Sequence, residues 1–172
     1  MEGNMKSLIE LQKNIDEKKK ILNLSVENDE PQDVLYQKSV DTDEAIAEYM
    51  KAVQYYKAER EKIINLHGDI INTPFKDEII NQIESDVLKR YPNISRKELK
   101  HFSTNIYIYA ILIANNVDKF KLVAVINNLN CIYAEEWQED GVVQDSLIHE
   151  VNTDFYRALN KKYLEIVKEK LK

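Results

Sequence analysis

A complete helix-start signal lies at residues 93–99, Asn-Ile-Ser-Arg-Lys-Glu-Leu. The Ser95 hydroxyl is placed to accept a hydrogen bond from the backbone N–H of Glu98, and the Glu98 side chain can reach back to the N–H of Ser95. Ile94 and Leu99 flank this cap as an apolar pair that fixes the angle at which the chain enters the helix. Pro92 ends the preceding helix. Similar start and stop signals recur along the chain, so they constrain the fold to a series of helices.

Glycine and proline are scarce, which favours helices over sheets. The chain of 172 residues holds three glycines and three prolines, whereas a sheet protein of this size needs many tight turns that draw on these residues. An apolar fraction of 44% is enough to build a core, and 31% charged residues suit an exposed surface. We therefore predict an all-α fold, in which an N-terminal antiparallel helical hairpin is followed by a compact helical bundle.

The hairpin is predicted over residues 1–66 and is expected to be coiled-coil-like. A first helix over 6–24 carries apolar residues at helical spacing, and a polar segment over 25–33 forms the loop. A second helix is expected over 42–65, with Asp41 and Glu44 as its cap pair and Gly68 as a left-handed residue after its end. The expected stripes are Leu8, Leu11, Ile15 and Leu22 on the first helix, and Ile46, Tyr49, Val53, Tyr56 and Ile63 on the second, with Met50 and Ile64 beside them.

The bundle domain is predicted over residues 67–172. Thr73 and Pro74 are expected to cap and open a helix that runs to residue 91, and the helix from Ser95 to Ala114 is expected to be the central one because almost every position after Ile106 is apolar. Asp118 is expected to cap a short helix, and a last helix is expected over 143–170. The expected apolar positions are Phe75, Ile79, Ile83, Val87, Leu99, Phe102, Ile106, Tyr109, Ile113, Phe120, Val123, Ile126, Leu129, Leu147, Val151, Phe155, Leu159 and Ile166.

The charge, the cysteine content and the lack of a long apolar run limit the partners and the cellular locations to be expected for the protein. The formal charge of −6 disfavours binding to a phosphate backbone, which needs clustered positive charge. Cys131 stands alone and cannot form an internal disulfide, which favours a reducing cytoplasm. The longest apolar run, 106–114, is far shorter than the ~20 residues that span a membrane. Frequent Lys, Ile and Asn are typical of AT-rich bacterial or phage genomes. We expect a cytoplasmic protein that does not enter a membrane.

Motifs for metal, cofactor or covalent chemistry are missing from the sequence. Helical di-metal sites use a Glu-x-x-His motif on each of two helices, and this chain has one such pair, Glu98 and His101, which is too few for a site. His149 and Asp145 are too few for a metal site, and three scattered glycines cannot form a phosphate-binding loop. Cys131 has no histidine near it in sequence to activate it as a nucleophile. We expect no metal and no cofactor, and a binding protein more than an enzyme.

Two charged clusters are candidate surfaces. The basic one surrounds the Pro92 turn and comprises Lys89, Arg90, Arg96, Lys97, Lys100 and His101. It is interpreted as a solvated helix junction, with a DNA-reading helix-turn-helix as the alternative, and we do not expect direct nucleic-acid binding. The acidic one places an aromatic side chain among carboxylates and is a candidate partner-binding segment: Glu135, Glu136, Trp137, Glu139 and Asp140. Its alternative interpretation is a core tryptophan beside solvated acids.

The stretch Ser39-Val40-Asp41-Thr42-Asp43, followed by Ile46 and Tyr49, carries the one family resemblance. Residues 8–50 resemble the short two-helix aspartyl-phosphate phosphatases that act on the response regulator of the sporulation phosphorelay. Ser39, Asp43, Ile46 and Tyr49 fit the family motif, Asp41 is a conservative match, and Val40 and Thr42 depart from it. The resemblance implies that Asp43 is the functional acid, that Ser39 supports it, and that Ile46 and Tyr49 help the motif helix dock on the regulator.

Three functions are left open by these observations. The first is a small acidic regulator or inhibitor that acts by binding another protein, in which the hairpin can also pair with a second copy as a homodimer. The second is an aspartyl-phosphate phosphatase whose partner is a response regulator. The third is a phage inhibitor that mimics nucleic acid and occupies a host defence or transcription complex.

Overall fold

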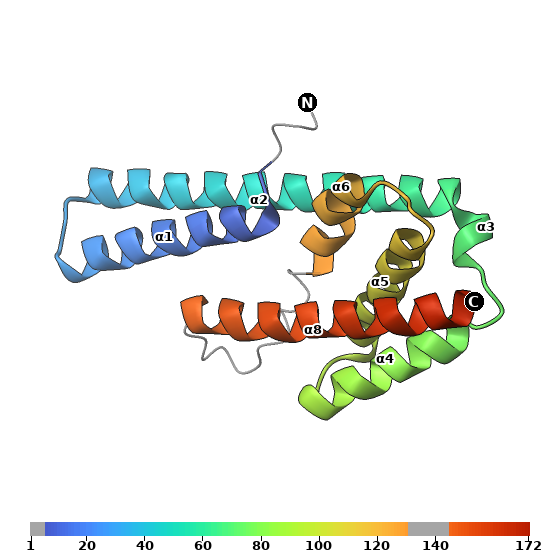
Figure 1. Cartoon of the computed structure of the whole chain (residues 1–172). Coiled ribbons are helices and arrows are strands. Elements are labelled where there is room, and N and C mark those ends of the chain that lie inside the picture. The colour runs from blue at the N-terminus through green and yellow to red at the C-terminus, as the bar shows by residue number, and fades with distance from the viewer. Residues whose placement is uncertain (1–5, 131–144) are drawn as a thin grey trace. The chain divides into compact units, whose positions relative to one another are not determined.

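The computed structural model describes residues 6–130 and 145–172 of the chain, and every element in these ranges is a helix, which confirms the all-α prediction (Figure 1). One element, labelled η2, is a single turn of π-helix. No helix in these ranges combines the length and the apolar character needed to cross a bilayer. The elements are α1 Leu8–Glu27, α2 Gln32–Leu66, α3 Gly68–Ile71, α4 Lys76–Arg90, α5 Arg96–Ala114, α6 Lys119–Leu122, η2 Val123–Asn127 and α8 Asp145–Leu171.

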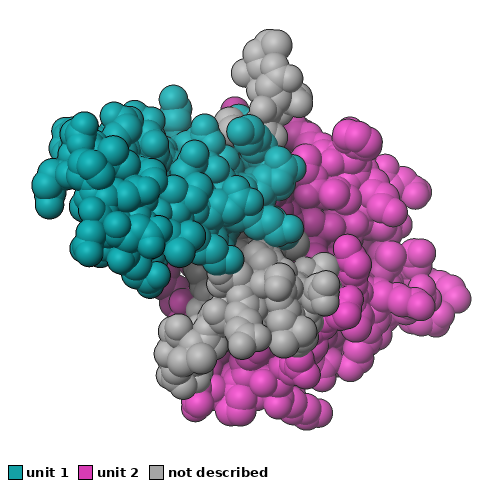
Figure 2. Space-filling model, turned by 90° about the vertical axis from the view of Figure 1, so that its left-hand side faces the viewer, with its two compact units in different colours: residues 1–57 teal, residues 58–172 magenta. Residues whose placement is uncertain are grey.

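The chain forms two compact units, residues 1–57 and 58–172 (Figure 2). The first holds α1 and most of α2, and the second holds the remaining helices together with the end of α2. This division falls inside α2, whereas the predicted domain boundary of 66/67 coincides with the end of that helix. The boundary between the two packed units therefore does not coincide with the end of a helix.

Helix α1 extends to Glu27, so the predicted loop over 25–33 is shorter than expected. The Ser7 hydroxyl caps the helix by accepting the N–H of Glu10 at 3.1 Å. At its other end, the backbone N–H of Asn28 donates to the Leu24 carbonyl, which closes the last turn. Asp29 then adopts a left-handed φ of 52°, which turns the chain toward α2.

Helix α2 begins at Gln32, so the predicted start at residue 42 with an Asp41–Glu44 cap is wrong. The Pro31 carbonyl accepts the N–H groups of Val34 and Leu35, each at 3.1 Å, and so starts the helix. Asp41 lies well inside α2, where its carboxylate accepts a hydrogen bond from Gln37 at 3.0 Å. The apolar residues of the first turn, Val34, Leu35 and Tyr36, are consecutive in sequence, so they show no helical period that would reveal this start.

The hairpin is antiparallel, as predicted (Figure 1). Its two helices share a heptad seam, whose buried residues are separated by three, four, seven or ten positions and so keep one heptad register. They are Leu8, Leu11, Ile15 and Ser25 on α1 and Thr42, Ala45, Ala52 and Tyr56 on α2. Of the predicted α2 stripe, Tyr56 and Ile63 are buried, whereas Ile46, Tyr49 and Val53 are only half-buried. The small residues Thr42 and the two alanines take the seam positions instead. The Tyr56 hydroxyl donates to the Lys6 carbonyl at 3.0 Å and ties down the start of the chain.

The connection from α2 to α4 differs from the predicted caps at both ends. Gly68 begins the short helix α3 without a left-handed φ, so it is not the C-terminal cap of α2. Thr73 does not cap α4, which starts at Lys76 after Phe75. The Tyr107 hydroxyl donates its one proton to the Ile71 carbonyl at 2.7 Å, so the Thr73 hydroxyl donates to the Tyr107 oxygen at 2.8 Å. The Thr73 hydroxyl is therefore engaged in a tertiary hydrogen bond and does not cap the helix.

Helix α5 is the central helix of the second unit, as predicted, and it packs against α3, α4, η2 and α8. The Ser95 cap is confirmed, because its hydroxyl accepts the N–H of Glu98 at 3.2 Å. The helix ends at Ala114, followed by Asn116 with a left-handed φ of 61°. Side chains buried on α5 include Leu99, Phe102, Ile106 and the whole run from 105 to 112.

Helices α4 and α8 cover α5 and are linked to each other. On α4 the buried residues are Ile79, Ile80, Ile83 and Val87. The predicted apolar positions Ile79, Ile83 and Val87 are therefore confirmed as buried, whereas the predicted Phe75, just before the helix, is half-buried. On α8 the described buried residues are Tyr156, Leu159, Tyr163 and Val167, so the core face is turned slightly from the predicted one. The side chains of Leu147 and Val151 lie outside the described residues. Asp86 of α4 accepts hydrogen bonds from Lys162, at 2.6 Å, and from Tyr163 of α8.

The Asp118 cap is confirmed, but the face predicted after it is wrong in part. The Asp118 carboxylate accepts the N–H groups of Phe120, at 2.9 Å, and Lys121, at 3.4 Å. Phe120 is 88% exposed, and Val123 is also exposed. The buried residues are Leu122, Val125, Ile126 and Leu129. The predicted positions recur at every third residue, whereas the buried ones begin at Leu122 and follow helical spacing, so the predicted face was wrong at its start.

Candidate functional site

The outer surface of α2 in the first unit carries a second heptad stripe beside the seam. We call it the outer stripe, and its members recur three and four residues apart: Tyr36, Ser39, Asp43, Ile46, Met50 and Val53. Residues at this spacing share one face of a helix. The seam and the outer stripe together give α2 two adjacent faces, of which only the seam is buried within the chain.

The outer stripe exposes large apolar side chains to an unusual extent. Tyr36 is 71% exposed and Met50 is 58% exposed, while Ile46 and Val53 are half-buried. A phenol and a flexible thioether on one helical face provide adaptable contact area for another protein. This arrangement is typical of a helix face that lies in an apolar groove of a partner.

The two residues predicted as the functional acid and its support meet on this stripe. Ser39 and Asp43 lie one helical turn apart, and the Asp43 side chain is exposed. Thr42 lies between them on the seam and is buried, with its hydroxyl donating to the Lys38 carbonyl at 2.9 Å. The departure from the family motif at Thr42 therefore falls on the packing face, and the candidate polar residues stay on the outer one.

Ile46 follows Asp43 on the outer stripe, whereas the other predicted docking residue, Tyr49, belongs to the seam and is half-buried. Tyr36 and Met50 were not among the predicted site residues. Each of them lies seven residues from Asp43. This spacing is the signal that could have identified them, because positions 36, 43 and 50 are equivalent in a heptad. The structure thus joins three of the four motif residues on one surface and adds two apolar neighbours.

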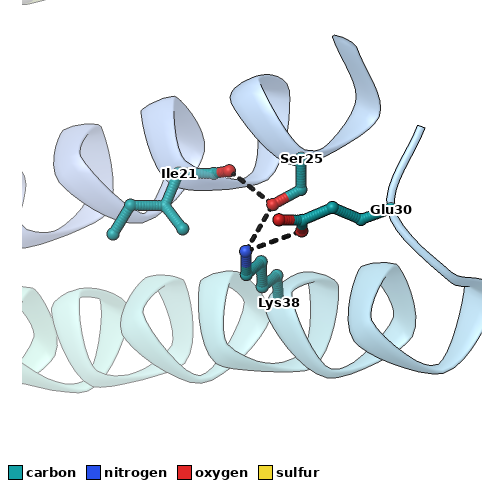
Figure 3. A network of polar contacts seen from close by, with 4 residues as sticks. All are labelled: Ile21, Ser25, Glu30 and Lys38. Atoms are coloured by element: carbon teal, nitrogen blue, oxygen red, sulfur yellow. Dashed lines mark hydrogen bonds and ion pairs between the residues drawn. The ribbon is translucent and has the colours of Figure 1, made fainter. Parts of the chain in front are cut away.

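A polar network closes the loop end of the hairpin next to the outer stripe (Figure 3). The Lys38 ammonium points from α2 toward α1, where it donates to the Ser25 hydroxyl and, at 2.8 Å, to the Glu30 carboxylate. The Ser25 hydroxyl in turn donates to the Ile21 carbonyl at 3.1 Å. Ser25 is buried, so the lysine enters the seam itself. One such polar layer in a heptad seam fixes the register of two helices.

The same network sets the electrostatics of the loop. The hydrogen bond from Lys38, followed by the Ser25 hydroxyl and the positive charge of Lys38, lowers the pKa of Glu30 despite the opposing effect of burial. Glu30 therefore stays ionised at neutral pH and holds the lysine in place. Ser39 is the next residue along α2.

The candidate acidic segment, Glu135, Glu136, Trp137, Glu139 and Asp140, lies outside the described residues. The basic cluster at the Pro92 turn lies on the surface of the second unit, between α4 and α5. The Arg90 guanidinium there lies over the rings of Tyr91, at 5.9 Å, and Phe155, at 5.6 Å, so this cation packs on aromatic rings of its own chain.

Within residues 6–130 and 145–172, no group of three or more histidine, cysteine or acidic side chains is close enough to hold a metal ion. The chemistry of the outer stripe is therefore that of one exposed carboxylate, the Ser39 hydroxyl and the Tyr36 phenol among apolar side chains. Such a surface can bind a protein, and its carboxylate can orient or deprotonate a water molecule. No family model, curated protein or solved structure matches the chain.

Proposed function

We propose that the protein is a small helical regulator or inhibitor that acts by binding another protein through the outer stripe of α2. The observation that carries this proposal is the exposure of Tyr36 and Met50, 71% and 58%, at heptad spacing on one helix face. An exposed apolar patch rimmed by polar residues marks an interaction site, and here Tyr36 and Met50 lie on the same helix face as the half-buried Ile46 and Val53. Frequent Lys, Ile and Asn support a bacterial or phage origin, and the single Cys131 supports a reducing cytoplasm.

Met50→Glu tests the surface, because a charge placed at the middle of the stripe opposes its burial against a partner. The full chain is used to capture proteins from the native cell, with mass spectrometry as the readout. We expect a partner that wild type retains to be reduced about tenfold or more by Met50→Glu, as for a central interface residue. Circular dichroism verifies that the variant stays helical.

The matched control is Leu24→Glu, because Leu24 is 57% exposed and lies on α1, away from the outer stripe. This variant introduces the same charge at nearly the same exposure and should retain the partner. Equal recovery of the same protein by wild type and Met50→Glu would remove the proposal. Equal loss in both glutamate variants would show a general charge effect and would count against it too.

The second candidate function is dephosphorylation of a response regulator, and the placement of Ser39 and Asp43 side by side on the outer stripe favours it. The reaction would hydrolyse the acyl phosphate of an aspartate, with Asp43 orienting the attacking water and the apolar stripe holding the regulator. Both candidate functions use the same surface, so the difference between them is the role of the Asp43 carboxylate.

Asp43→Asn separates the two, because it removes the charge and keeps the shape. We expect the rate of phosphate loss from a phosphorylated receiver domain to fall about a hundredfold or more if the carboxylate acts as a general base. The control is Glu44→Gln, an exposed acid on the neighbouring face of α2, which should keep the wild-type rate. A wild-type rate equal to that of the receiver domain alone would exclude the phosphatase function and leave the binding function standing.

A further inference from the structure

An apolar cavity in the second unit lies between the end of α2 and the start of α6. Its volume is about 380 Å³, which is within the range of roughly 300–1,000 Å³ found for ligand sites. The apolar part of its lining comes from Ile63, Leu66, Val117 and Leu122. Ile63 and Leu122 are buried core residues, so they form a fixed floor.

The charged groups around this cavity are mostly basic. Lys62, His67 and Lys121 line it, and Asp118 is the one acid among its lining residues. The Asp118 carboxylate accepts the backbone N–H groups of Phe120 and Lys121, so it is oriented toward the start of α6. Lys62 lies 3.1 Å from Glu59. Lys121 lines the cavity and is exposed.

We infer that this cavity binds a small apolar carboxylate, with the hydrocarbon tail against Ile63, Val117 and Leu122 and the carboxylate at Lys121. The apolar floor accepts the tail, and the basic rim complements the charge. A neutral hydrocarbon would make no ion pair with the basic rim, and a short polar anion would make no apolar contacts with the floor. The site shares no residue with the outer stripe, so it is independent of the proposed function.

The probe is sodium octanoate, titrated into the full chain with labelled isoleucine, leucine and valine methyl groups. We expect the methyl signals of Ile63, Val117 and Leu122 to shift together and to saturate. Octan-1-ol has the same tail without the charge and should bind about fivefold more weakly, as expected for one partly exposed ion pair. Butyrate should bind much more weakly still, because each buried methylene strengthens binding about fourfold.

Lys121→Gln should weaken octanoate binding about fivefold and leave octan-1-ol binding unchanged. Lys119→Gln is the matched control, since Lys119 is an exposed lysine of the same helix that does not line the cavity. Three results would each overturn the inference: no shift of the three methyl groups, equal affinity for octanoate and octan-1-ol, or an unchanged octanoate affinity in Lys121→Gln. Saturation of the same methyl groups by a tryptophan peptide flanked by glutamates, without any response to octanoate, would also overturn it and assign the cavity to a polypeptide.

Discussion

Replacing Phe102 with alanine is expected to lower the free energy of unfolding by about 3–5 kcal/mol, the range measured for aromatic residues removed from a core. Phe102 is fully buried on α5, and its ring lies edge-on to that of Tyr156 on α8 at 6.2 Å between centroids. The substitution removes this contact and leaves a cavity at the centre of the second unit. Urea denaturation followed by circular dichroism measures the loss.

Phe120→Ala provides a control with the same change of side chain. Phe120 is 88% exposed, so its removal should change the free energy of unfolding by no more than ~0.5 kcal/mol. If both substitutions cost the same, α5 would not be the core of the unit. The pair also checks which face of α6 is buried, because the sequence pattern placed both phenylalanines on apolar faces.

Replacing Asp86 with alanine is expected to cost about 1.5–3 kcal/mol at neutral pH, the usual value of hydrogen bonds to a charged group. The Asp86 carboxylate accepts from Lys162 and Tyr163 of α8, so the substitution also strands the largely buried Tyr163 hydroxyl. Burial and the neighbouring carboxylate raise the pKa of Tyr163, so its hydroxyl keeps the proton that it donates. Glu165→Ala, an exposed acid on α8, should cost no more than ~0.5 kcal/mol.

The effect of Asp86 should depend on pH in a defined direction. Burial raises the pKa of Asp86, but the hydrogen bonds from Lys162 and Tyr163 outweigh it, and the pKa lies below its ordinary value of 3.8. A lowered pKa in the folded state means that the stabilisation is complete above the unfolded pKa and is lost as the pH falls through the folded one. The difference between wild type and Asp86→Ala should stay constant from pH 7 to about 5 and shrink below pH 3.8. A difference that grows on acidification would contradict this assignment.

Helices were predicted best where a polar cap and an apolar period coincide. The Ser95 and Asp118 caps were correct because their hydrogen bonds are local and need no tertiary partner. The start of α2 was missed because the apolar residues of its first turn, Val34, Leu35 and Tyr36, are consecutive, and because the backbone carbonyl of Pro31, not a side-chain cap, starts the helix. Thr73 was predicted to cap a helix because its competing hydrogen bond, to Tyr107, joins residues far apart in the chain and cannot be recognised from the local sequence.

The candidate site was predictable in its polar part and not in its apolar part. The family resemblance singled out Ser39, Asp43 and Ile46, and they share one face of α2 because the helix begins before Ser39 and not at the predicted residue 42. The seam was assigned to large apolar residues, whereas Thr42 and Ala45 occupy it. Small residues in the seam let the two helices approach closely, but they add little to the hydrophobicity of that helix face. The apolar pattern of the sequence therefore indicated the wrong face of α2 as the packing face, and it did not reveal that Met50 is exposed.

The uneven composition of the hairpin seam implies that its two ends have different local opening free energies. Near the chain start the seam holds Leu8 and Leu11, which are fully or almost fully buried, whereas Ser25 and Lys38 occupy it near the loop. Segments with few apolar contacts open first and exchange their amide protons fastest. The hairpin should therefore unzip from the loop, carrying Tyr36 and Ser39 with it. A partner that engages those residues would stabilise the least stable part of the hairpin, so its binding would appear as slower amide exchange at the loop end.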